Sequence, residues 1–186
     1  DLLHLQLDRT PFYAESGGQL ADTGRIHNAD FEMRVSQVIK KDDHFIHIGT
    51  LTSGAVNHAS VTAEVDQPRR LDVMRNHTAT HLLHKALRAV LGEHVQQKGS
   101  LVGPEHLRFD FTHMQALTKP EIQAIENIVN AAIRDNRAVK VEVKDLDEAR
   151  GEGAIALFGE KYAEQVRVVS VEGFSKELCG GTHVSA

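Results

Sequence analysis

The first third of the chain shows the alternation of apolar and polar residues that is typical of half-buried β-strands. Residues 2–7 and residues 61–65 both alternate in this way. Between them, apolar runs flank the polar stretch KKDD at residues 40–43, which predicts a hairpin tip. Several short strands joined by turns are typical of a small barrel or a curled sheet, so we expect a β-barrel-like subdomain here.

The periodicity changes after the stretch QPRR at residues 67–70. A proline disfavours helix in the residue before it, so Pro68 marks a boundary between two kinds of structure. We therefore expect two subdomains, residues 1–68 and residues 69–186.

The second part of the chain combines helical and alternating patterns. From about residue 71, apolar residues recur every three or four positions until Gly92, which predicts the end of a helix. TKPE at residues 118–121 is a capping box that opens a second helix. Alternating patterns predict three strands, at residues 107–111, 139–143 and 166–173. Residues 145–162 are predicted to form one or two short helices interrupted by glycines. The sequence therefore predicts an α+β fold in which helices pack on a largely antiparallel sheet after the small N-terminal β-subdomain.

Composition narrows the class of protein. The chain has 186 residues, of which 41% are hydrophobic and 25% charged, an ordinary globular composition. Its single cysteine excludes an internal disulfide, and it has no apolar run long enough to span a bilayer, so we expect a cytoplasmic protein with no membrane partner. The formal net charge is -5, so binding of nucleic acid would need local basic groups. The candidates are Arg69, Arg70, Arg75, Lys98 and Lys161.

Two short pairs of residues carry the chemistry. His77 and His81 are four residues apart on the predicted helix, so both imidazoles leave the same face and can reach one ion. The apolar stripe of that helix points nearly the opposite way, so we expect this face to lie away from the core. Cys179 and His183 are joined by Gly-Gly-Thr, which lets the backbone turn tightly. One thiolate and three imidazoles form a borderline-soft donor set that suits zinc.

Each pair has a simpler interpretation when taken alone. Two histidines four apart arise often by chance, and a single cysteine is usually a buried, inert side chain. The conjunction of the two pairs favours a shared metal site. His84 lies one turn further along the same face, where it could replace a ligand, although we expect it to support a ligand or to be solvated. PFYAESGGQ at residues 11–19 is an ordinary turn-rich loop or an anion-binding concavity formed by its backbone amides.

Several segments together resemble a known family. RNHTATHLLH, VQQKGSLV, LRFDF, ALFGEKY, ELCGGTHV and the upstream PFYAESGGQ resemble the editing domain of bacterial alanyl-tRNA synthetase. The free-standing AlaX-type trans-editing proteins and the threonyl-tRNA synthetase editing domain share the histidine and cysteine part. PFYAESGGQ favours the alanyl type, and the start at Asp1 favours a segment of a longer synthetase.

The resemblance implies a function and a set of residues. It implies hydrolysis of the ester that joins a wrong amino acid, Ser or Gly, to the 3′ end of tRNA(Ala). His77, His81, Cys179 and His183 would hold Zn²⁺, whereas Thr80 and Gln97 fall on positions of the amino-acid pocket and catalysis. The implied partners are tRNA(Ala) and the rest of the synthetase chain. Two alternatives stay open: a threonyl-type or free-standing deacylase, and a non-catalytic tRNA-binding module stabilised by zinc.

Overall fold

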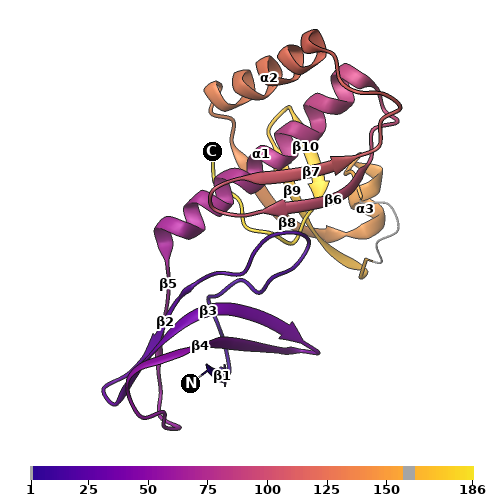
Figure 1. The fold of residues 1–186 in the computed structure, drawn as a ribbon. Helices are drawn as coiled ribbons and strands as arrows, with labels where there is room; N and C mark the ends of the chain where they lie inside the picture. The colour runs from indigo at the N-terminus through magenta and orange to yellow at the C-terminus, as the bar shows by residue number, and fades with distance from the viewer. Residues whose placement is uncertain (1, 157–161) are drawn as a thin grey trace.

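A computed structural model describes residues 2–156 and 162–186 of the chain. Figure 1 shows an N-terminal sheet at one end of the molecule, a mixed α and β unit at the other, and one long helix that leads from the first into the second. The predicted α+β class is confirmed. Among the described residues, no helix is long and apolar enough to cross a membrane.

The N-terminal unit is a five-stranded antiparallel sheet in the order β1-β4-β3-β2-β5. Bulges in β3 bend the two long central strands, so the sheet curls. Among the described residues its edge strands β1 and β5 do not pair with each other, so the sheet is not a closed barrel. The predicted hairpin is confirmed: β3 turns into β4 at Asp42, which adopts a positive φ of 53°. The strands are β1 (Leu2–Gln6), β2 (Gly24–His27), β3 (Phe31–Lys41), β4 (His44–Gly54) and β5 (Thr62–Val65).

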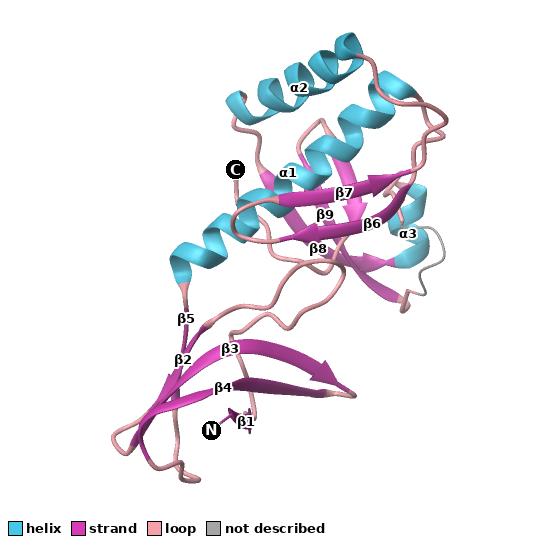
Figure 2. Cartoon of the chain, in the orientation of Figure 1, coloured by secondary structure: helices cyan, strands magenta, loops and turns pink. Residues whose placement is uncertain are grey.

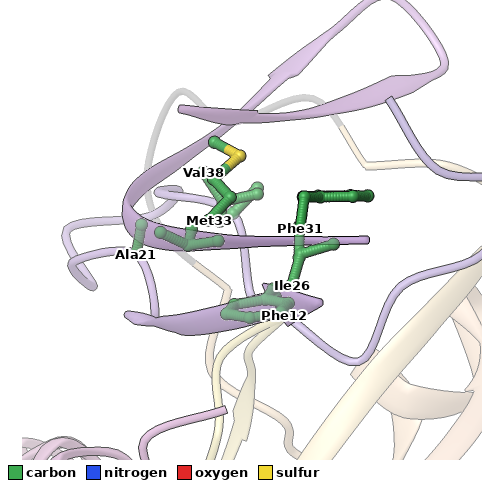
Figure 3. Packing of buried hydrophobic residues seen from close by; sticks show 8 residues of the cluster. Phe12, Ala21, Ile26, Phe31, Met33 and Val38 are labelled. Atoms are coloured by element: carbon green, nitrogen blue, oxygen red, sulfur yellow. The ribbon is translucent and has the colours of Figure 1, made fainter. Parts of the chain in front are cut away.

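The concave side of this sheet holds its own apolar core. Ile26, Met33 and Val38 project from the strands and are completely buried. Phe12 and Ala21, from the loop between β1 and β2, cover them (Figure 3). Phe12 and Ala21 therefore fix the loop to the N-terminal sheet, while the residues between them can contact other parts of the chain.

The long helix α1 (Gln67–Leu91) begins earlier than the predicted residue 71. Asp66 caps it by accepting a hydrogen bond from the Arg69 amide. Pro68 lies in the first turn, where a missing N–H removes no hydrogen bond, so the proline starts the helix and does not delay it. The predicted end at Gly92 is confirmed.

The second unit packs two helices and two small sheets around α1. The strands β8 and β9 and the helix α2 with its capping box are confirmed, as is the strand β7, whereas β6 and β10 were not predicted. The order of the larger sheet is β10-β9-β8, and β6 pairs with β7. Of the predicted segment 145–162, the first residues form a short helix, and residues 157–161 lie outside the described residues. The elements are β6 (Gln97–Val102), β7 (Leu107–Phe111), α2 (Lys119–Arg134), β8 (Val139–Asp145), α3 (Leu146–Gly151), β9 (Gln165–Val171) and β10 (Ser175–Leu178).

Candidate metal centre

The structure brings the four predicted donor residues together. His77 and His81 project from α1, and Cys179 and His183 come from the segment that follows β10. Their ligand atoms all lie within 4.8 Å of one another. Sγ of Cys179 is 3.4 Å from Nε2 of His77 and 3.3 Å from Nε2 of His183. Residues more than 100 positions apart in sequence thus meet at one point.

The histidine face of α1 is buried, which corrects the expectation that it lies away from the core. His77, His81 and His84 are between 2% and 6% exposed. The helix is covered on two sides, because α2 packs on its apolar stripe while β10 and the C-terminal segment cover the histidines. A polar cluster with so little access to water needs partners within the protein.

Two of the imidazoles have such a partner on the nitrogen that faces away from the cluster. Nδ1 of His77 lies 2.6 Å from Oε1 of Gln19, and Nδ1 of His183 lies 3.2 Å from the Thr78 hydroxyl. A metal-ligating histidine usually uses its second nitrogen in this way, which fixes the ring and directs the other nitrogen to the ion. His81 differs, because its Nδ1 makes no hydrogen bond among the described residues and lies 3.9 Å from Glu177.

The protonation states suit a metal site. Burial lowers the pKa of His77 to about 3, and burial also lowers the pKa values of His81 and His183. These imidazoles are therefore neutral at pH 7, the state in which a histidine binds a metal. Burial raises the pKa of the Cys179 thiol to about 11, so metal binding must release its proton.

The spacing of the donors fits a zinc ion. Bond lengths of about 2.0–2.1 Å to nitrogen and 2.3 Å to sulfur give a nitrogen–sulfur separation of roughly 3.5 Å in a tetrahedron. Two nitrogen–sulfur separations match this value, 3.4 Å for His77 and 3.3 Å for His183. Thiolate sulfur and imidazole nitrogen are both donors that zinc binds, so the residues present fit this ion.

Backbone contacts fix the loop that carries the cysteine. Arg167, on β9, donates to the carbonyl oxygens of Cys179 and Gly181 at 2.9 Å and 2.5 Å. A Cβ atom at Gly181 would lie 2.0 Å from Cε1 of His77, so only glycine allows the loop to pass this close to the ring. Of the two glycines in the CGGTH segment, Gly181 therefore serves the close approach, whereas a Cβ atom at Gly180 would meet nothing within 4 Å.

The Gly-rich loop between β1 and β2 reaches the cluster from the N-terminal unit (Figure 2). Gly18 and Leu20 form backbone hydrogen bonds with Val102 of β6, at 2.8 Å and 3.0 Å, which dock the loop on the second unit. Gln19, between them, is fully buried against His77. The sequence predicted a turn or an anion site for this loop and gave Gln19 no role of its own. The one local signal for Gln19 is its position directly after Gly-Gly.

The structure places the remaining predicted residues in different surroundings. Thr80 is buried on α1, and its hydroxyl donates to the Asn76 carbonyl at 2.8 Å. Gln97 begins β6 and is partly exposed. His84 is buried and not solvated, and its Nδ1 lies 3.3 Å from the carboxylate of Glu177. That carboxylate therefore lies between His84 and His81.

The basic candidates for phosphate contacts are mostly engaged within the protein. Arg70 forms an ion pair with the buried Asp22, and Arg69 donates to the Ala21 carbonyl at 2.7 Å. Both arginines therefore bind the N-terminal loop to α1. Arg75 forms an exposed pair with Asp72, Lys98 lies exposed on β6, and Lys161 is outside the described residues.

Comparison with known proteins shows similarity to aminoacyl-tRNA synthetases. Residues 3–69 match the profile described as tRNA synthetases class II (A), and residues 166–186 match that of the threonyl and alanyl tRNA synthetase second additional domain. Over 185 residues the chain is 52% identical to the alanine–tRNA ligase of Thermoanaerobacter sp. (strain X514). The resemblance to alanyl-tRNA synthetase is confirmed. A relative from Desulforamulus reducens, also an alanine–tRNA ligase, is 53% identical over 186 residues.

These alignments cover 99% of the chain and 21% of each relative. The chain thus spans about a fifth of the length of the alanine–tRNA ligases that it matches. The match to the second additional domain includes Cys179 and His183 of the donor cluster.

Proposed function

We propose that this chain is a zinc-dependent deacylase that hydrolyses Ser-tRNA(Ala) and Gly-tRNA(Ala), the proofreading reaction of an alanyl-tRNA synthetase. One observation carries the proposal: a buried cluster of one cysteine and three histidines in a chain similar to alanine–tRNA ligases. Its partners would be the 3′ end of tRNA(Ala) and the rest of the synthetase chain, in the cytoplasm. Residues 1–68 and 69–186 would be its two subdomains.

The four donors would hold the ion and other polar residues would receive the substrate. A zinc ion held by His77, His81, Cys179 and His183 supplies a Lewis acid that can anchor the substrate or acidify a water molecule. Because the hydroxyl hydrogen of Thr80 is used on the Asn76 carbonyl, its oxygen remains an acceptor for the hydroxyl of a serine substrate. Gln97 would position the ester or water with its amide.

Physical limits on selectivity explain why such a reaction is needed. A pocket built for alanine cannot strongly exclude glycine, because one methyl group is worth only about 1–3 kcal/mol. It also cannot strongly reject a small analogue that adds a hydroxyl. A second site with a polar partner for that hydroxyl removes serine and spares alanine, which would leave the partner unsatisfied, whereas removal of glycine needs a different contact.

Hydrolysis of Ser-tRNA(Ala) by the isolated chain tests this proposal. We expect release of serine by the wild-type chain and retention of zinc at one ion per chain. A double variant, Cys179→Ala with His183→Ala, should lose both zinc and activity. Full zinc occupancy in the double variant would place the ion elsewhere.

A second candidate function is a non-catalytic tRNA-binding module stabilised by zinc. It is favoured by the number of donors, because four protein ligands close a tetrahedral site and leave no open position. A zinc-loaded chain that binds tRNA(Ala) and leaves its serine ester intact would support this candidate over the deacylase.

A further inference from the structure

The side-chain amide of Gln19 connects the two units of the chain at the donor cluster. It comes from the loop between β1 and β2, is completely buried, and meets residues more than 50 positions away in the sequence. Its Oε1 lies 2.6 Å from Nδ1 of His77 and accepts the backbone N–H of Thr182 at 2.8 Å. Its Nε2 donates to the Thr182 hydroxyl at 2.9 Å.

These contacts determine which nitrogen of His77 carries the proton. A backbone N–H can only donate, so the Thr182 amide requires the oxygen of Gln19 on its side. The same oxygen faces Nδ1 of His77, which must therefore be the protonated nitrogen and donate to it. The lone pair of His77 is then on Nε2, the nitrogen that lies 3.4 Å from Sγ of Cys179.

We propose that Gln19 is a positioning residue of the metal centre and that, through it, the N-terminal unit and zinc binding stabilise each other. This inference rests on the proposed zinc site. Gln19 holds a ligand from α1 and the loop between Cys179 and His183 at once, so it fixes two parts of the donor set relative to each other. Coupling between two binding events is reciprocal, so zinc in turn strengthens the docking of the Gln19 loop on β6.

Zinc affinity of three variants tests the role of Gln19. Gln19→Met keeps the length of the side chain and removes the acceptor, whereas Gln19→Glu retains an acceptor for His77 and Thr182. Gln37→Met makes the same chemical change at an exposed site of β3. Loss of such an outer partner typically weakens metal binding about 10- to 100-fold, which we expect for Gln19→Met alone. Affinity of Gln19→Met equal to that of Gln37→Met would overturn the inference.

Hydrogen exchange supplies a readout that does not depend on activity. In the wild-type chain, zinc should slow exchange of the Thr182 amide, bonded to Gln19, and of the Leu20 amide, bonded to Val102 at 3.0 Å. In Gln19→Met this zinc effect on Leu20 should be lost, and an unchanged effect would contradict the coupling. Failure of the proposed function would be seen in a different experiment. A zinc-loaded wild-type chain that hydrolyses no Ser-tRNA(Ala) would overturn the proposed deacylase activity, and the comparison of zinc affinities would still decide the role of Gln19.

Discussion

A single methyl group at Gly181 is expected to weaken zinc binding at the proposed site. A Cβ atom there would lie 2.0 Å from Cε1 of His77 and 2.7 Å from Oε1 of Gln19. Ordinary contact begins near 3.4 Å, so the ring or the loop must move by about 1.4 Å. Metal–ligand distances vary by only about 0.2 Å, so a movement of this size removes one imidazole from the ion.

The size of the effect follows from the number of ligands. Structural zinc contributes about 12 kcal/mol in small domains, so an equal share for one of four ligands is about 3 kcal/mol, or roughly a hundredfold in affinity. Competition with a chromophoric chelator measures this for Gly181→Ala and for Gly180→Ala, whose Cβ would meet no atom within 4 Å. Melting of the metal-free variants checks that both fold. Equal zinc affinity of the two variants would refute the steric reasoning.

Three further substitutions test the substrate pocket, a buried ion pair and a buried histidine. Thr80→Val should slow hydrolysis of Ser-tRNA(Ala) roughly two- to tenfold and of Gly-tRNA(Ala) less, whereas an equal loss would assign Thr80 to general positioning of the site. Arg70→Gln removes the ion pair of the buried Asp22 carboxylate, which keeps its hydrogen bond from the Tyr13 amide, and should lower the unfolding free energy by about 3–5 kcal/mol; an unchanged urea midpoint would contradict this. Burial lowers the pKa of His47, so its neutral form stabilises the fold above pH 6.5 and this contribution is lost as the pH falls below that value. Urea unfolding at pH 7.5 and 5.5 should therefore show less acid destabilisation for His47→Gln than for the wild-type chain, and equal acid sensitivity would argue against a neutral His47.

Patterns of residues close in sequence predicted two of the helix ends correctly. The capping box at Thr118 and the glycine after Leu91 fix helix ends through residues close in sequence, and both are confirmed. The convergence of the two pairs of donors was also predictable, because the chemistry of one ion requires them to meet. β6 was missed because a register shift near Gly99 interrupts any alternation.

Long-range contacts explain what the sequence could not reveal. The burial of the His77 face depends on the C-terminal segment that covers α1, and the helix periodicity carries no information about a segment 100 residues away. The contact of Gln19 with Thr182 spans 163 residues and is invisible to any local pattern. In the same way Arg70 resembles a phosphate ligand in sequence, and only the fold reveals its buried partner Asp22.

If zinc at the four-residue cluster makes this chain a deacylase, as we propose, hydrolysis must depend on bound zinc. The most direct measurement is the rate of Ser-tRNA(Ala) hydrolysis while zinc is added stepwise to chelator-treated chain. We expect negligible hydrolysis without zinc, a rate that rises in proportion to added zinc and a break at one ion per chain, with Ala-tRNA(Ala) left intact throughout. A rate that is already full before zinc is added, or that stays at zero once one ion is bound, would contradict the proposal.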